Sequence, residues 1–333
     1  MPAVPALPAR ILYIRTDRLG ETLLTLPALA AVRQAFPGSR LTFLAHPALA
    51  GLLRGWPVLD EVVEDRSDGR LAWWRRAGWL AERLRPLRCD AAIVSNPKKE
   101  LHLAVWLAGI PIRIGYDRKW AWTLNRRLSD DKALGERHEV EYNLELVRLL
   151  GVPAASVPPV RLPIAPADAA ALLDLLAARG VGASDVVVAA HPWTSNPKKQ
   201  WPLDRFAEVI RRLQRLPNVV VVLVGGPEEQ AGAGPLLGMV AGRAVNLVGR
   251  LSLRGLAACL SRARVLVSND SGPVHVAAAV GTPTVVLFGT IDPAAGPRRW
   301  GPWGDGHTVL CRPTVEQTTA EEVTAAVERY VGG

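Results

Sequence analysis

The feature that most constrains the fold is a regular alternation of short apolar runs with segments of helical periodicity. The runs are rich in β-branched residues and too short for helices. Such alternation is typical of parallel βαβ units, whose helices cover both faces of a sheet. The expected strands are Arg10–Arg15, Leu41–Leu44, Ala91–Ser95, Asp185–Ala190, Val219–Gly225, Val265–Ser268 and Thr284–Phe288, and the expected helices are Leu23–Phe36, Leu203–Arg215, Leu253–Arg262, Val274–Val280 and Thr319–Tyr330.

A proline-rich stretch, Val152–Pro166 (VPAASVPPVRLPIAP), interrupts this alternation, which then begins again. It has the composition of a linker. A chain of 333 residues is also long for a single core. We therefore expect two doubly wound α/β domains, residues 1–160 and residues 161–333.

Charge and cysteine usage narrow the class of protein. The net charge of +9 and the pI near 10.0 favour anionic partners, although no nucleic-acid-binding motif is present, and we expect no nucleic-acid partner. Cys89, Cys259 and Cys311 share no disulfide or zinc-ligand spacing. No signal peptide and no apolar run of membrane-spanning length is recognisable, so the sequence predicts a cytoplasmic protein.

The first polar turn that points to chemistry follows the first expected strand and has the sequence TDRLGET, Thr16–Thr22. Gly20 permits a close backbone approach, and Glu21 falls in the first turn of a helix. A carboxylate there is either a functional group or a helix-stabilising charge of about 0.3–1 kcal/mol. The residues alone leave both interpretations open.

Two further turns contain groups suited to a phosphate. The segment HPWTSNPKKQWP carries the Thr194 and Ser195 hydroxyls and a lysine pair, which can hold a phosphate or can form a solvated loop. In SNDSGPVH, a helix is expected to begin at about Pro273, so that the N–H groups of Ser271 and Gly272 form an anion site suited to a diphosphate.

Three other residues complete the expected donor side. Asp270 is placed to orient a sugar hydroxyl, and His275 lies on the first turn of the same helix. In the segment GGPEE, Gly225 lets a nucleotide pass closely and Glu228 offers a carboxylate to ribose hydroxyls, although a plain strand-to-helix turn has the same composition.

Several classes of site are absent from the sequence. No GxxxxGK[ST] loop is present, which excludes a P-loop nucleotide-binding protein. The segment HEVEY has Tyr142 where a zinc-binding HExxH motif needs its second histidine. Only Asp130 and Asp131 suggest a divalent cation, so we expect no metal site.

Taken together, these segments resemble glycosyltransferase family 9, the ADP-heptose:lipopolysaccharide heptosyltransferases. The matching text is RILYIRTDRLGETLLTLPAL, HEVEYNLELVRLLG, HPWTSNPKKQWP and VGRLSLRGLAACLSRARVLVSNDSGPVHVAAAVGTPTVVLFGTIDP. The resemblance implies a GT-B fold, in which two Rossmann-like domains face each other across a cleft. It further implies an inverting, metal-independent transfer of a heptose or similar sugar to a lipopolysaccharide inner-core or related glycan. The donor that the resemblance implies is an ADP-sugar, ADP-heptose in this family.

The resemblance also assigns roles to single residues. The catalytic base corresponds to Glu21, where the family typically has aspartate; Asp17 is a reserve candidate. Lys199, in the Lys-x-Trp spacing, corresponds to the lysine beside the donor phosphates. Asp270, Ser271, Gly272 and His275 match the donor-binding motif of a C-terminal domain whose final helix can pack back on the N-terminal domain. No cofactor is implied beyond the nucleotide-sugar substrate.

The acceptor is expected on the N-terminal domain. Arg70–Arg88 reads as a basic amphipathic helix, with Trp73, Trp74, Ala77, Leu80 and Leu84 on one face. This surface is suited to lipid head groups or acceptor phosphates at the inner membrane, or it is an ordinary packed helix with a solvated basic face. The candidate acceptor-binding residues are Asp17, Arg18, Lys98, Lys99 and Arg118.

Two other functions remain open at this stage. An epimerase or hydrolase of the same fold would act on the donor alone. A catalytically silent protein that binds sugar nucleotides or lipopolysaccharide would also fit, because glutamate replaces the usual aspartate at position 21.

Overall fold

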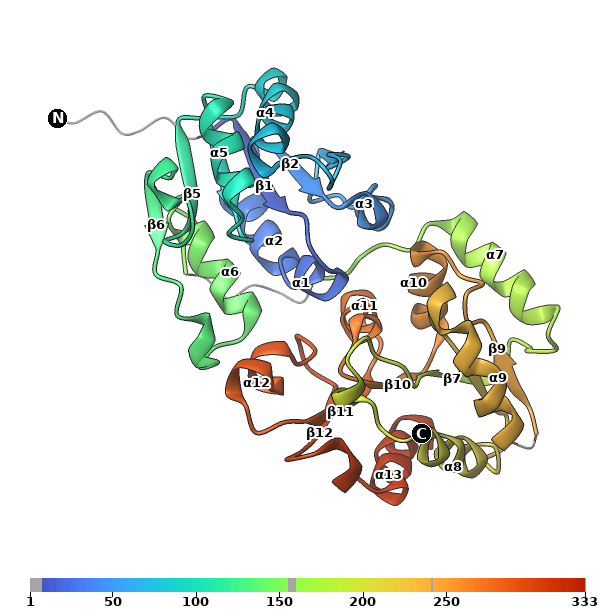
Figure 1. Cartoon of the computed structure of the whole chain (residues 1–333). Helices are drawn as coiled ribbons and strands as arrows, with labels where there is room; N and C mark the ends of the chain where they lie inside the picture. Colours follow the sequence, from blue (N-terminus) through green and yellow to red (C-terminus); the bar gives the residue numbers. More distant parts are fainter. Residues whose placement is uncertain (1–7, 155–159, 241, 333) are drawn as a thin grey trace. The chain divides into compact units, whose positions relative to one another are not determined.

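A computed structural model describes residues 8–154, 160–240 and 242–332 and divides the chain into two compact units, Met1–Val160 and Arg161–Gly333 (Figure 1). Each unit contains one six-stranded parallel sheet. Residues 155–159 of the predicted linker lie outside the described residues. Each unit is described by itself below.

In the first unit the strands run in the order β3-β2-β1-β4-β5-β6. This is the doubly wound order, in which the chain moves outward in one direction from the first strand and then in the other. The apolar runs that the sequence predicts as strands therefore form the predicted parallel sheet. The strands are β1 (Arg10–Arg15), β2 (Arg40–Ala45), β3 (Glu61–Glu64), β4 (Ala91–Val94), β5 (Ile112–Tyr116) and β6 (Arg126–Leu128).

Helices cover both faces of this sheet. The helices α4 and α5 pack together over a core that includes Leu12 and Ile14 of β1, and α2 packs against α6. Their bounds are α1 (Leu19–Leu23), α2 (Leu26–Ala35), α3 (Pro47–Leu53), α4 (Trp73–Leu84), α5 (Lys99–Leu107) and α6 (Glu139–Arg148).

The helix predicted over Leu23–Phe36 is confirmed as α2, but it begins three residues later than predicted because the chain breaks between α1 and α2. The Thr25 hydroxyl donates to the carbonyl of Thr22 at 2.6 Å, which closes the first helix. Pro27 then stands in the first turn of the next helix, where its missing N–H costs nothing. The break separates the short helix that carries Glu21 from the packed helix behind it.

The second unit repeats the topology, with the strand order β12-β11-β10-β7-β8-β9. The strands are β7 (Val186–His191), β8 (Val219–Leu223), β9 (Ala244–Asn246), β10 (Val265–Asn269), β11 (Thr284–Gly289) and β12 (Thr308–Arg312). The helices are α7 (Pro166–Ala177), α8 (Leu203–Leu213), α9 (Gln230–Met239), α10 (Leu253–Arg262), α11 (Gly272–Val280), α12 (Pro297–Trp300) and α13 (Ala320–Val331).

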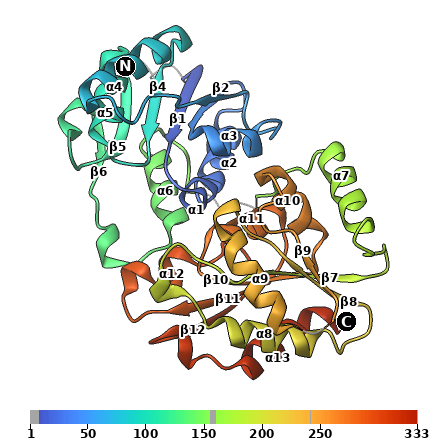
Figure 2. The same ribbon diagram turned by 45° about the vertical axis from the view of Figure 1, so that its right-hand side comes forward.

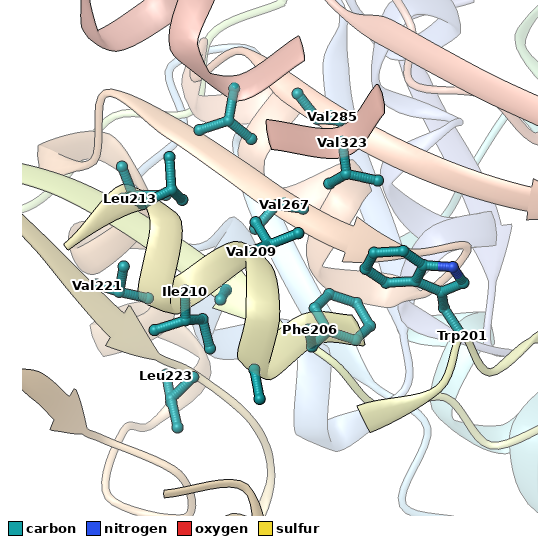
Figure 3. Packing of buried hydrophobic residues seen from close by; sticks show 14 of the residues in the cluster. Trp201, Phe206, Val209, Ile210, Leu213, Val221, Leu223, Val267, Val285 and Val323 are labelled. Carbon is teal, nitrogen blue, oxygen red and sulfur yellow. The ribbon is translucent and has the colours of Figure 1, made fainter. Parts of the chain in front are cut away.

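The helices of this unit also form two layers. In both views α8 and α13 lie side by side on one face of the sheet, and α7, α10 and α11 lie on the other (Figure 2). Figure 3 shows Val209 and Ile210 of α8 packed with Val221, Val267 and, from α13, Val323. The apolar face of the last helix thus packs in the core of the second unit.

Candidate functional site

The carboxyl edge of the second sheet brings two of the predicted turns together. The strands β7 and β10 are neighbours, with His191 opposite Ser268. Because the chain winds away from this pair in opposite directions, their carboxyl ends flank the switch point where doubly wound sheets bind ligands. The segments HPWTSNPKKQWP and NDSGPVH therefore meet there, although 77 residues separate His191 from Ser268.

An ion pair joins these two turns. The Lys199 ammonium lies 2.5 Å from a carboxylate oxygen of Asp270, whose side chain is only 9% exposed. Burial raises the pKa of Asp270, and the adjacent Lys199 charge works against that rise. The carboxylate, predicted to orient a sugar hydroxyl, is thus first of all the partner of the predicted phosphate lysine.

Two neighbouring residues, Trp201 and Asn269, hold the segment that carries Lys199. Trp201 is fully buried, packs edge-on against Phe206 and donates its indole N–H to Thr318 (Figure 3). Asn269 accepts from the Trp201 backbone N–H at 3.0 Å and donates to the Pro192 carbonyl at 2.6 Å. Sequence reasoning named the Lys-x-Trp spacing but missed Asn269, because a polar residue at a strand end gives no sign of its partners.

A second cluster at this edge was also missed in part. The His191 imidazole lies between Ser271, whose Oγ is 3.0 Å from Nδ1, and Glu229, whose Oε2 is 3.1 Å from Nε2. Burial raises the pKa of the Glu229 carboxyl, but the hydrogen bond and charge of His191 outweigh it and leave that pKa below its ordinary value. Of the two adjacent glutamates, the sequence singled out Glu228, which is exposed, whereas Glu229 turns inward.

The remaining predicted donor residues lie on the same turns. Thr194 accepts a hydrogen bond from the Asn196 backbone N–H at 3.4 Å, and Ser195 is exposed. Gly225 follows β8, and a Cβ there would come within 2.5 Å of a Glu229 carboxylate oxygen. Gly272 begins α11, and His275 is buried on that helix.

In the first unit, Glu21 is a half-buried carboxylate on the short helix α1. Burial raises its pKa, while a bond from its own backbone N–H works in the other direction. Arg18 occupies the N-cap position of α1 and is exposed. A carboxylate with a raised pKa holds a proton more readily than an exposed one, which is the property a general base needs.

The reserve candidate, Asp17, is held differently. The Arg15 guanidinium lies 2.7 Å from Asp17 and 3.3 Å from the buried Glu139, to which Lys132 is also paired at 2.6 Å. The Asp17 carboxylate is thus engaged in an ion pair with a buried guanidinium.

A cavity of about 670 Å³ opens at the carboxyl edge of the first sheet. Thr16, His46 and Asp65, which follow β1, β2 and β3, line it together with Lys98, which precedes α5. Arg66 and Arg76 add two guanidinium groups, each of them paired with a carboxylate: Arg66 with Glu64 at 2.6 Å and Arg76 with Asp65 at 2.8 Å. The cavity is thus polar and contains both signs of charge.

The other predicted acceptor residues are not all at this cavity. Lys99 places its ammonium 4.4 Å from the ring centre of Trp73, and Arg118 is paired with Asp130 at 2.9 Å. The predicted apolar face of the basic helix needs one correction, because Trp74 is 53% exposed. The buried residues of α4 are Ala77, Leu80, Ala81 and Leu84, which leaves Trp74 outside the packed stripe.

A tryptophan cluster lies next to these cations. It consists of Trp73, Trp106, Trp120 and Trp122, with successive ring centroids 4.6, 5.5 and 5.8 Å apart in the order Trp73, Trp120, Trp122, Trp106. Trp106 and Trp122 are 44% and 61% exposed. Exposed indoles beside basic side chains are typical of surfaces that meet a membrane interface.

Two negative findings concern the described part of the chain. Among residues 8–154, 160–240 and 242–332, no group of three or more His, Cys, Asp or Glu side chains is arranged to hold a metal ion. Within the same residues, no helix has both the length and the apolar character needed to cross a membrane.

Comparison with known proteins gives consistent matches along the whole chain. A family model described as glycosyltransferase family 9 (heptosyltransferase) matches residues 78–330. Lipopolysaccharide heptosyltransferase 1 of Escherichia coli O18:K1:H7 is 25% identical over 331 residues, which cover 96% of this chain and 97% of that protein.

Two solved structures share the fold. A family 9 glycosyl transferase from Veillonella parvula matches with a TM-score of 0.89 and 23% identity, over 97% of each chain. The E. coli heptosyltransferase WaaC with ADP-2-deoxy-2-fluoro heptose matches with a TM-score of 0.71 and 24% identity, over 96% of this chain and 99% of that one.

Proposed function

Because this chain belongs to glycosyltransferase family 9, the heptosyltransferase family, we propose that it transfers a heptose or similar sugar from an ADP-sugar to an inner-core lipopolysaccharide or related glycan. The enzyme is a glycosyltransferase and its fold is GT-B, as the sequence predicted. The finer parts of the proposal are the donor, the acceptor, inversion and independence of metal ions.

The observation that carries the proposal is the Lys199–Asp270 ion pair beside the start of α11. The first N–H groups of a helix lack partners within it and bear a partial positive charge. Together with the Lys199 ammonium, they form a cationic site that suits a diphosphate. An E. coli relative of the same fold was solved with an ADP-heptose analogue, which supports an ADP-sugar as the donor.

The environment of Glu21 supports an inverting reaction with one base. In that reaction the acceptor oxygen bonds to the anomeric carbon, and its proton passes to the Glu21 carboxylate. The bond from the anomeric carbon to the diphosphate oxygen breaks, and its electron pair stays on the leaving ADP. The raised pKa of Glu21 improves its match to this proton.

Lys199 and the α11 N-terminus supply the positive charge that the leaving diphosphate needs. Fixed donors aimed at developing charge lower the barrier without reorganising during the reaction. We therefore propose that the transfer needs no metal ion and no cofactor apart from the nucleotide-sugar substrate.

The acceptor is proposed to bind at the cavity of the first unit, where Lys98 and Arg66 can meet its phosphate or carboxylate groups. A glycolipid acceptor is embedded in a membrane, so the enzyme must reach a bilayer surface. The exposed Trp106 and Trp122, close to the cations of α4 and α5, support peripheral contact with the inner membrane from the cytoplasmic side.

The direct test supplies ADP-heptose with a lipopolysaccharide precursor that lacks inner-core heptose. ADP release, mass of the glycan product and anomeric configuration are measured with EDTA present throughout. We expect ADP release that depends on the acceptor, a product heavier by one heptose, and an inverted anomeric centre. Glu21→Gln serves as the matched variant, because the amide keeps the shape of the side chain and cannot take the proton.

Each part of the proposal has its own contrary result. ADP release without acceptor would indicate a hydrolase, and an isomerised donor would indicate an epimerase. Retained configuration would overturn the single-base mechanism, and activity that vanishes with EDTA and returns with magnesium would overturn metal independence.

A further inference from the structure

The Ser271 hydroxyl is not used in the way its position suggests. Ser271 is the N-cap residue of α11, where a serine normally accepts a hydrogen bond from an N–H of the first turn. Here its side chain makes no such bond and lies 3.0 Å from Nδ1 of His191. The hydroxyl therefore caps no N–H of the first turn and is coupled to an imidazole. Pro273 has no N–H, the Val274 N–H donates to the Ser271 carbonyl at 3.2 Å, and the Gly272 N–H is the one at the start of α11 that a ligand could use.

The imidazole is held from both sides in a nearly dry environment. His191 is 3% exposed, and its Nε2 lies 3.1 Å from Glu229, which also accepts from the Gly226 backbone N–H at 2.8 Å. On the other side, Ser268 lies 3.4 Å from Nδ1 and donates its own proton to the Asn269 carbonyl at 2.8 Å. Ser271 is the hydroxyl left to bond with Nδ1.

The Ser271 and Ser268 hydroxyls also lie 3.0 Å apart, and Ser268 donates its proton to the Asn269 carbonyl, so the directions of the remaining hydrogen bonds follow from the Glu229 contact. The Glu229 carboxyl has a lowered pKa and is an acceptor, so Nε2 must carry hydrogen. In the neutral imidazole Nδ1 is then an acceptor, and the Ser271 O–H donates to it. In this state Ser271 offers a ligand only lone pairs, which repel a phosphate oxygen.

We propose that donor binding adds a proton to His191, so that Nδ1–H donates to Ser271 and the Ser271 O–H turns toward the diphosphate. This inference rests on the proposed function, because it assumes that a diphosphate binds at the start of α11. The proton comes from solvent, and the Glu229 carboxylate stabilises the imidazolium. His191 and Glu229 are therefore positioning residues that act through Ser271.

Other charged groups at this edge do not replace Glu229. Asp270 and Lys199, from the turns after β10 and β7, are paired with each other, and His275 is carried on α11. Glu228 is exposed beside Glu229. Of these, Glu229 is the carboxylate in hydrogen-bond contact with the His191 ring.

The proposal predicts the direction in which ligand affinity changes with pH. If one proton is taken up with the ligand, the affinity falls as pH rises, by about tenfold per pH unit. Sugar transfer leaves the diphosphate with one more negative charge, and the imidazolium then faces that charge through Ser271.

The experiment is isothermal titration calorimetry of the full chain with ADP-ribose, whose diphosphate diester lacks the secondary phosphate ionisation near pH 6. Binding enthalpies in buffers of low and high ionisation enthalpy give the number of protons taken up. For the parent chain we expect uptake of up to one proton and an affinity that weakens as pH rises, by about tenfold per pH unit where a full proton is taken up.

Three variants separate coupling from simple structural damage, and melting temperature reports whether each remains folded. Ser271→Ala should bind more weakly and take up almost no proton, because the link to the ligand is gone. Glu229→Gln should also lose most of the uptake, since it cannot compensate the imidazolium. Glu316→Gln, an exposed glutamate of the same unit, should behave like the parent.

The outcomes are distinct. If the parent binds ADP-ribose without proton uptake, or if folded Glu229→Gln retains the full uptake, the inference is wrong while the proposed function stands. If the parent binds neither ADP-ribose nor ADP, both are overturned.

Discussion

Replacing Lys199 by methionine tests whether the donor site holds a buried charge that depends on its partner. The substitution keeps most of the apolar stem of the side chain and removes the ammonium. It leaves the Asp270 carboxylate, with 9% of its side chain exposed, without the cation that lies 2.5 Å away. Asp270 then either remains charged in a poorly solvated place or takes up a proton.

Uptake of a proton by Asp270 limits how much stability the variant can lose. Protonating an ordinary aspartate at pH 7 costs about 4 kcal/mol, from roughly three pH units at 1.36 kcal/mol each, and at pH 5 the cost is about 1.5 kcal/mol. Breaking a fully buried pair costs about 3–5 kcal/mol and breaking an exposed pair under about 1 kcal/mol. Because Lys199 is 30% exposed, we expect a loss of about 2–4 kcal/mol at pH 7 and at most about 1.5 kcal/mol at pH 5.

The direction in which the loss of stability changes with pH follows from the coupling of Asp270 protonation to folding. In the variant, burial raises the pKa of folded Asp270 above its unfolded value, so the loss is absent below the unfolded pKa and grows as pH rises toward the folded pKa. Urea denaturation followed by circular dichroism at the two pH values measures it. The double variant Lys199→Met/Asp270→Asn should recover much of the loss at pH 7. Equal losses at both pH values, or no recovery in the double variant, would refute the reasoning.

Three other predictions follow from the site. Glu21→Gln should lower turnover by about 10²–10⁴-fold with little change in ADP affinity, and an unchanged rate would exclude Glu21 as the base. Because burial raises the pKa of Glu21, the acid limb of the parent's pH–rate profile should lie above the ordinary glutamate range. Sugar transfer should proceed at the same rate after dialysis against EDTA, and a rate restored only by added metal would contradict this. The double variant Trp106→Ser/Trp122→Ser should reduce co-sedimentation of the protein with anionic vesicles. The control Leu173→Ser, which removes a 52% exposed side chain from α7, should not. Equal vesicle binding by the two variants would show that the tryptophan cluster is not the contact surface.

The sequence determined much of the fold because apolar periodicity acts locally. The runs that became β1, β7, β8, β10 and β11 are continuous apolar segments, and a sheet covered on both faces is where such segments are buried. Their polar turns had to lie at the carboxyl ends, which is why the segments expected to hold a phosphate could be named in advance. Local geometry also misled, since the periodicity over Leu23–Phe36 continued through the Thr25 hydroxyl bond that ends α1.

Tertiary structure decided which of the named groups are partners. Lys199 and Asp270 are 71 residues apart, and only the adjacency of β7 and β10 makes them an ion pair. The adjacency of β7 and β8 brings the turn after β8 to His191, and that turn aims the Glu229 carboxylate at the imidazole and leaves Glu228 exposed. In the first unit, the packed sheet likewise decides that the Arg15 guanidinium pairs with Asp17 and with Glu139. Sequence sets which residues reach the edge of a sheet, whereas charge pairing and burial depend on side-chain directions that only the packed strands define.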